Sequence, residues 1–342
     1  TRKPNFKHSM IDHQVAIRFR RLGTLTIFAV YFVILVGGIV RASGAGMGCP
    51  DWPTCFGQWV PPTHESQLPS NYQEIYAERG YAETRFNPVK TWTEYINRLV
   101  GVTIGFFIFL TAIQSRAYLK SDKAVFYLCL TVFFMVGFQG WLGSVVVSSN
   151  LHPYIITLHM LLALVIVAIL IYAIARSQKV FLSQIDSGRL TRKFNKVLMI
   201  AMGMTLLQVA MGVQIREAVD VIANEHSYIE RQYWRDDFPM IFYVHRSFSA
   251  LILFTNLWLG WEIHKAFTKD SILFKSGVAL VALIIIAILA GVAMDRLGMP
   301  PAAQPIHLLM ASLIFGLQFF IYICVHYASS NRTKSTIPDL NS

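Results

Sequence analysis

Two histidines of this sequence recur at a fixed interval. His159 and His307 lie 148 residues apart, and the same interval separates Asn97 from His245. Matching polar residues in the two halves of a chain indicate a duplicated structure. All four lie in or near long apolar stretches, where imidazole is costly and usually serves a function. Two facing imidazoles between helices are suited to axial ligation of haem iron.

Eight apolar blocks must position these residues. Hydrophobic residues make up 54% of the chain and charged residues only 14%, whereas soluble domains carry about 25% charged residues. The blocks are Leu22–Val40, Leu99–Ile113, Ala124–Val147, Tyr154–Ala175, Val197–Ile215, Ile241–Trp261, Gly277–Met294 and Ile306–Tyr327. A helix needs roughly 20 residues to cross a bilayer, so the short second block must recruit Glu94 and Asn97. The sequence predicts an all-α integral membrane protein with eight transmembrane helices.

The spans are expected to divide into two pseudo-symmetric four-helix bundles. Because four is an even number, both bundles enter the membrane in the same orientation, related by an axis along the membrane normal. The predicted units are a cytoplasmic arm (1–21), an N-terminal bundle (22–175), a cytoplasmic linker (176–196), a C-terminal bundle (197–327) and a cytoplasmic tail (328–342). The first outer loop, 41–93, is long enough that we expect it to have its own structure or function.

The positive charge of the chain is distributed as a membrane topology signal. The net charge is +11, and the predicted inner segments hold about two thirds of the 30 Lys and Arg residues but only about a third of the 19 acidic residues. This bias places both termini in the cytoplasm. The basic residues are therefore interpreted as topology signals and not as a nucleic-acid site. No cleavable signal peptide is expected, because the first block is long and lacks a cleavage motif.

The four repeated residues are expected at one depth in the membrane. Even-numbered spans run from outside to inside, and each repeated residue lies within about two turns of the outer end of such a span. His245 and His307 would then face each other as a bis-imidazole haem site, with Asn97 and His159 in the same places in the first half. A single membrane histidine is equally well explained by hydrogen-bonded packing, but the repeat favours ligation. The other histidines are interpreted as interfacial (His152, His226, His264, His326) or as carrying no signal (His8, His13, His64).

Polar residues beside these positions could take part in the chemistry. Glu94 lies three residues before the first repeated position, where a carboxylate could accept a proton; the alternative is an exposed interfacial acid. Arg98 and Arg246 directly follow repeated positions and could pair with haem propionates or extend to the water layer. Gln139 and Gln208 lie inside apolar spans, where we expect hydrogen bonds between helices.

Two of the four cysteines lie close together in the first outer loop. Cys49 and Cys55 occur in GCPDWPTCFG on the predicted outer side, where an oxidising environment favours a disulfide. A structural link and a redox-active pair remain equally open, and zinc is less favoured because no second ligand pair follows. Cys129 and Cys324 lie inside apolar blocks, as small buried hydrophobic residues do.

Five segments of the sequence carry a family resemblance. The most specific is GGIVRASGAGMGCPDWPTCFGQW, and the others are TEYINRLVG, QGWLGSVVVSSNLHP, YVHRSFSAL and PIHLLMA. With these segments the chain resembles the haem A synthase family, eight-span enzymes of bacterial membranes and mitochondria. The resemblance extends from about Phe19 to Tyr327, and the paired cysteines are similar to those of the bacterial branch.

The resemblance implies a reaction, its sites and its partners. Members of the family oxidise the C8 methyl of haem O to the formyl group of haem A by two successive hydroxylations and loss of water. The resemblance implies haem b at His245 and His307, substrate haem at His159, a functional glutamate at Glu94 and a redox role for the cysteine pair. It also implies a haem O synthase and a terminal oxidase pathway as partners and a location in the bacterial inner membrane, and it is compatible with a homo-oligomer.

Asn97 departs from the family pattern, which usually has a second histidine three residues after the glutamate. An amide is a poor iron ligand compared with imidazole. His159 could hold the substrate iron alone and leave one axial face open, which is the reading we favour. Alternatively, Asn97 could orient a water molecule, or the activity of this member could be altered or lost.

Other functions fit parts of the sequence. A membrane cytochrome b that only carries electrons would need the same histidines but neither a substrate pocket nor Glu94. A quinone-linked thiol oxidase would use Cys49 and Cys55 but would normally need a second cysteine pair. A transporter would fit the repeat alone, although no carboxylate relay within the membrane supports it.

Overall fold

The computed structural model describes residues 12–185, 189–225 and 234–335. The predicted arm is therefore described only from residue 12, the linker lacks 186–188, and the tail is described only as far as residue 335. The interpretations of His8 and His226 lie outside the described residues.

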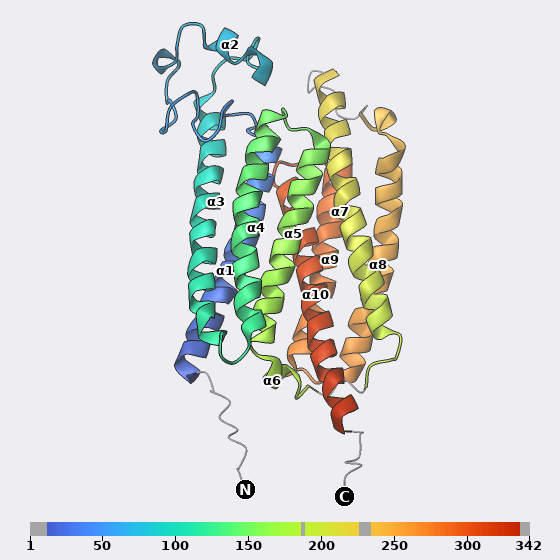
Figure 1. The fold of residues 1–342 in the computed structure, drawn as a ribbon. Helices are drawn as coiled ribbons and strands as arrows, with labels where there is room; N and C mark the ends of the chain where they lie inside the picture. The colour runs from blue at the N-terminus through green and yellow to red at the C-terminus, as the bar shows by residue number, and fades with distance from the viewer. Residues whose placement is uncertain (1–11, 186–188, 226–233, 336–342) are drawn as a thin grey trace, which may run out of the picture.

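Eight helices in the described part of the chain are long and apolar enough to cross a membrane, which confirms the predicted all-α membrane fold. They are α1 (His13–Ala42), α3 (Pro88–Ser115), α4 (Lys123–Ser148), α5 (Pro153–Arg176), α7 (Phe194–Glu225), α8 (Met240–Ala266), α9 (Ile272–Arg296) and α10 (Ala303–Ser335). The short helices α2 (Tyr72–Ile75) and α6 (Lys179–Leu182) lie in the first loop and in the linker. α1 begins and α10 ends at the same side of the bundle, and α2 lies at the opposite side (Figure 1). We call the side that carries α2 the outer end.

The two halves of the chain have the same pattern of neighbouring helices. In the first half α1 contacts α3, α3 contacts α4, α4 contacts α5, and α5 contacts α1, which makes a closed ring. The second half forms the same ring from α7, α8, α9 and α10. The halves meet where α10 contacts α1 and α5 and where α5 contacts α7. This pattern is the one expected of two bundles related by an axis along the membrane normal, and it sets α3 opposite α5 and α8 opposite α10.

Local sequence signals fix where the helices begin. Asn87 caps α3 by accepting a hydrogen bond from the backbone N–H of Lys90 at 3.1 Å, and Pro88 occupies the first helical turn, where its missing N–H costs nothing. α5 also has a proline, Pro153, in its first turn, but its N-cap residue His152 makes no capping hydrogen bond through its side chain. The start of α3 at Pro88 confirms that the second span recruits residues before Leu99, and it brings Glu94 and Asn97 onto this helix.

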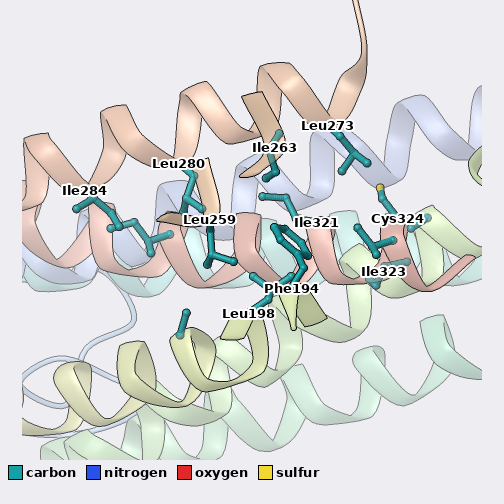
Figure 2. Packing of buried hydrophobic residues seen from close by; sticks show 14 of the residues in the cluster. Phe194, Leu198, Leu259, Ile263, Leu273, Leu280, Ile284, Ile321, Ile323 and Cys324 are labelled. Carbon is teal, nitrogen blue, oxygen red and sulfur yellow. The ribbon is translucent and has the colours of Figure 1, made fainter. Parts of the chain in front are cut away.

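The second bundle is closely packed in the part that lies away from the outer end. Phe194, Leu198, Leu259 and Ile321, from α7, α8 and α10, are all buried in one cluster (Figure 2). In a bilayer such contacts stabilise by van der Waals packing, since lipid is as apolar as the side chains. α8 and α9 approach so closely that a Cβ on Gly277 would lie 2.8 Å from Ile263 Cγ2. This packed end gives the helices a rigid base for the side chains nearer the outer end.

Helix α7 is longer than the sequence predicts. Its predicted apolar block ends at Ile215, but the helix continues to Glu225. The i,i+4 ion pair between Arg216 and Asp220 supports this extra length, and Val219 packs in a small cluster with Trp234. The acidic residues just beyond the apolar block, Glu217 and Asp220, therefore lie on this helix.

The first outer loop has a small core of its own. Phe56 is buried there, and its ring packs edge-on against the rings of Tyr72 and Tyr81 at centroid distances of 6.3 and 5.2 Å. Cys49 and Cys55, both fully buried in the same cluster, form a disulfide, as predicted.

Candidate functional site

A cavity of about 1300 Å³ extends through both bundles. Its lining includes all four repeated residues, Asn97, His159, His245 and His307, together with Glu94. The volume is larger than the roughly 300–1,000 Å³ typical of one small-molecule pocket. The cavity therefore has room for a ligand in each half.

His245 and His307 face each other across the second bundle. Their ring centroids are 6.2 Å apart, and the ring planes are inclined by 53°. An imidazole nitrogen lies about 2 Å from a bound metal and the ring centre roughly 1 Å farther, so two imidazoles on opposite sides of one iron have centres about 6 Å apart. The two side chains thus fit the axial ligands of one haem iron.

The backbone of α9 orients His307. Its Nδ1 lies 2.7 Å from the carbonyl oxygen of Ala287. A carbonyl can only accept, so the proton is on Nδ1 and the Nε2 lone pair is left for a metal, which is the usual arrangement of a metal-binding histidine. Gly291, one turn further along α9, would place a Cβ only 3.4 Å from His307 Cε1. A larger residue there would displace the imidazole.

His245 is held by a glutamine and a glycine of α7. Gln208 Nε2 donates to the carbonyl oxygen of His245 at 3.0 Å, and a Cβ on Gly212 would lie 3.6 Å from His245 Cε1. The Nδ1 atom of His245 is buried and has no hydrogen-bond partner among the described residues. A buried nitrogen without a partner is costly, so this position suits an imidazole whose orientation is completed by a bound group.

His159 in the first half is also held by a glutamine and a glycine, but these lie on α4, which corresponds to α9 and not to α7 in the repeat. Gln139 Nε2 donates to the carbonyl oxygen of His159 at 2.7 Å, and a Cβ on Gly143 would lie 3.5 Å from His159 Cε1. His159 Nδ1 is also buried without a partner in the described structure. The predicted hydrogen bonds of the two membrane glutamines between helices are therefore confirmed. Both glutamines support histidine positions, a role that the sequence analysis did not assign to them.

Asn97 stands in more open surroundings than its counterpart. Its Oδ1 atom is buried and has no partner within the described chain. Gly37 precedes Arg41 as Gly212 precedes Arg216, yet a Cβ on Gly37 would meet no described atom within 4 Å. The first half therefore lacks both the second imidazole and its close packing against a glycine.

Glu94 anchors the disulfide loop to α3. It is only 3% exposed, which excludes the alternative of an exposed interfacial acid. Its Oε2 accepts a hydrogen bond from the backbone N–H of Cys49 at 2.7 Å, and its Oε1 accepts one from Arg98 Nη2 at 2.5 Å. Thr91, one turn earlier, donates to the carbonyl oxygen of Gly48 at 2.8 Å. The carboxylate at the edge of the cavity is thus positioned by the loop that the disulfide closes.

The two arginines predicted to bind propionates have different surroundings. Arg98 donates to the carbonyl oxygens of Asp51, Thr54 and Cys49 at 2.8, 2.9 and 3.2 Å, as well as to Glu94. Its guanidinium is therefore already bound to the disulfide loop.

Arg246 is the more accessible of the two. Its side chain is 48% exposed, lies 3.9 Å from Asp295 and rests over the ring of Tyr243 at 5.5 Å. Both Arg98 and Arg246 line the cavity, and their propionate role stays a prediction.

An ion-paired group at the outer end was not predicted. Arg41 and Arg216 both pair with Asp220, at 2.7 and 2.8 Å, and both arginines line the cavity. The sequence does repeat a glycine four residues before each arginine. The carboxylate that joins them lies beyond the predicted apolar block Val197–Ile215, so the pairing could not be inferred.

This fold and site define a class of protein: a membrane protein of eight helices with facing histidines in a cavity large enough for two ligands. Comparison with protein families then gives the particular family. The sequence profile of COX15-CtaA, described as cytochrome oxidase assembly protein, matches residues 20–319. The chain belongs to this family.

Individual relatives share the name "Heme A synthase". The protein from Shewanella oneidensis is 30% identical over 161 residues, which cover 46% of each chain, and that from Shouchella clausii is 31% identical over 41% of this chain and 39% of its own. The matched part thus spans less than half the length of these two relatives. A protein of the same name from Brucella suis is 23% identical over 92% of this chain and 93% of its own.

Proposed function

We propose that this protein is an oxidoreductase that converts haem O to haem A, by oxidising the C8 methyl to a formyl group through two successive hydroxylations and loss of water. Membership of the COX15-CtaA family and relatives named "Heme A synthase" support this reaction. The observation that carries the proposal is the facing pair His245 and His307, whose separation of 6.2 Å between ring centres fits one haem iron.

In this proposal the second half holds a resident haem b. His245 and His307 would hold its iron, and the carbonyl of Ala287 accepts from Nδ1 of His307 and so leaves Nε2 available for a metal. A bound haem b would supply one-electron chemistry. The closely packed cluster next to the cavity in this half supports a site that holds its group permanently.

The first half is the proposed site of the substrate haem. Its wall on α3 and α4 is lined by glycines at 101, 105, 137 and 140. The residues at the same interval in the second half carry side chains; they are Ser249, Leu253, Ile285 and Ile288. A Cβ on Gly101, Gly137 or Gly140 would meet no described atom within 4 Å. A cavity wall made of glycines leaves space for a bulky ligand that must enter and leave.

The residues of the first half have distinct proposed roles. His159 binds the substrate iron, and Asn97, which offers no imidazole, leaves the opposite face open. Glu94 is the proposed proton acceptor beside the substrate, because its buried carboxylate lines the cavity and is held in place by Cys49 and Arg98. The disulfide loop would then act by positioning Glu94, and the arrangement supports a structural role of the cysteines without excluding a redox role.

The proposal includes partners and a location. A haem O synthase would deliver the substrate, and a terminal oxidase pathway would receive the product. The chain would lie in the bacterial inner membrane with both termini in the cytoplasm, which the bias of basic residues supports. The start of α1 and the end of α10 at one side of the bundle agree with an even number of crossings (Figure 1).

Haem extraction tests the proposed reaction. The full chain is expressed with a haem O synthase in a host that lacks haem A, and total haem is separated chromatographically. We expect haem A in these cells and none in a matched strain carrying Glu94→Gln, whereas His64→Ala in the outer loop should leave the amount unchanged. Haem b bound to the chain without any haem A would contradict the proposal and favour a cytochrome b that only carries electrons.

A further inference from the structure

Two arginines from different halves of the chain share one carboxylate near the outer end of the cavity. Arg41 on α1 places Nη2 2.7 Å from Asp220 Oδ2, and Arg216 on α7 places Nη2 2.8 Å from Asp220 Oδ1. The three side chains are between 23% and 29% exposed, so they are only partly hydrated. Two guanidinium groups thus share one carboxylate at the outer end of the cavity, whose lining also includes Glu217 and Asp295.

The position of each arginine follows from the internal repeat. Arg216 lies four residues beyond Gly212, the residue that contacts the imidazole of His245, so it lies about 6 Å further outward along α7. Arg41 has the same spacing from Gly37 on α1. Each half therefore carries one arginine about one helical turn outward from the level of its candidate iron site.

We infer that Arg41 and Arg216 bind the carboxylate groups of the porphyrins, Arg41 in the first half and Arg216 in the second, with Asp220 holding both guanidinium groups in position. This inference rests on the proposed function, since it requires a porphyrin in each half. Porphyrins of this class carry two propionates, and a guanidinium binds a carboxylate strongly because its N–H donors are charged and arranged in a fork.

The alternatives are less well placed for this role. The guanidinium of Arg98 is bound to three loop carbonyls and to Glu94. Arg246 is half exposed, which weakens any ion pair through hydration and salt. Arg41 and Arg216 are less exposed than Arg246, line the cavity, and are fixed by a common partner.

The shared carboxylate connects the two sites. Asp220 and Arg216 lie on α7 and Arg41 lies on α1, so the ion pairs join the two halves. A ligand carboxylate that binds one arginine competes with Asp220 for it and changes how Asp220 holds the other. The same group thus both positions the ligands and lets each half respond to the other.

Comparing the binding of haem b with that of a derivative whose propionates are neutral tests the inference. The full chain, produced under haem limitation and purified in detergent, is titrated with haem b and with haem b dimethyl ester, in which both propionates are neutral. The wild type should bind two equivalents of haem b, each roughly ten- to hundredfold more tightly than the ester, as expected for hydrogen bonds to charged groups. In Arg41→Gln and in Arg216→Gln, one of the two bound equivalents should no longer bind haem b more tightly than the ester. In the double variant, neither equivalent should show this difference.

Conservative and remote variants separate this role from a structural one. Arg216→Lys keeps the charge and should retain part of the preference, and Arg116→Gln, exposed at the inner end, should retain all of it. The inference would be overturned if Arg41→Gln and Arg216→Gln preferred haem b over the ester as strongly as the wild type does. It would also be overturned if this preference were lost in Arg246→Gln instead. A chain that makes haem A but never discriminates the ester contradicts this inference alone. A chain that discriminates as expected but makes no haem A contradicts only the proposed reaction.

Discussion

At the scale of single residues, the two halves differ most clearly at one position. His245 lies over Gly212, and Gln208 lies on the same helix as that glycine. Asn97 has a buried Oδ1 without a partner among the described residues, and a Cβ on Gly37 would meet no described atom within 4 Å. The interval between repeated residues revealed this difference from the sequence. Whether a larger side chain fits at this position depends on the free space around it, which only the structure describes.

Replacing Asn97 by histidine should convert the first half into a second bis-imidazole site. We expect Asn97→His to fold, because Gly37 leaves room, and to shift the haem in the first half from a high-spin to a low-spin spectrum. Haem A formation should stay within a fewfold of the wild type, because the family that carries out this reaction usually has histidine at this position. Electron paramagnetic resonance and haem extraction measure both effects, with Asn97→Ala as the control for loss of the amide. Unchanged spectra and turnover would show that the position is irrelevant.

At the scale of elements, the sequence predicts the helices better than it predicts their ends and loops. All eight apolar blocks became helices, because a run of this length can satisfy its backbone in a membrane only as a helix. The extension of α7 was missed because its last turns are polar and depend on contacts such as Arg216 with Asp220. The binding of Arg98 to the disulfide loop was also missed, since it joins residues more than 40 positions apart.

Opening the disulfide should weaken the positioning of Glu94. In Cys49→Ser the backbone of residue 49 is freed from Cys55, so its N–H no longer holds the Glu94 carboxylate at a fixed place. We expect haem A formation to fall roughly 10- to 100-fold, as for other small displacements of reacting groups, while the haem b content stays unchanged. Cys129→Ser, a free buried cysteine of α4, provides the control. Full turnover in Cys49→Ser would show that the loop does not position Glu94.

At the scale of the whole molecule, the two halves share one helix arrangement but line the cavity with different residues. The same ring of helices occurs in both halves, and the matching histidines His159 and His307 each lie against a glycine at the same interval, Gly143 and Gly291. Glycines of α3 and α4 line the cavity in the first half, and two of their counterparts in the second half, Ser249 and Ile288, line it with side chains. The repeat could be predicted from the sequence, but the walls could not, because a glycine gives no sign of whether it contacts a neighbouring helix or lines a cavity.

Filling the first wall should prevent binding of the substrate without affecting the resident haem. Gly137→Ile combined with Gly140→Ile introduces the side chains found at the same places in the second half, where they are tolerated. We expect the purified chain to keep one equivalent of haem b and to lose the second equivalent and haem A formation. Gly203→Ile on α7 is the control, because that glycine also has free space around it and lies outside the cavity lining. Two bound equivalents in the double variant would show that this wall does not accommodate the substrate.

The most direct test of the central claim is the spectrum of the haem in the second half. We predict that the purified wild type shows a six-coordinate low-spin haem b, that His307→Ala and His245→Ala each lose this signal, and that His264→Ala at the inner end of α8 keeps it. A low-spin signal that survives replacement of His245 or His307, or a purified chain that binds no haem after supplementation, would contradict the account.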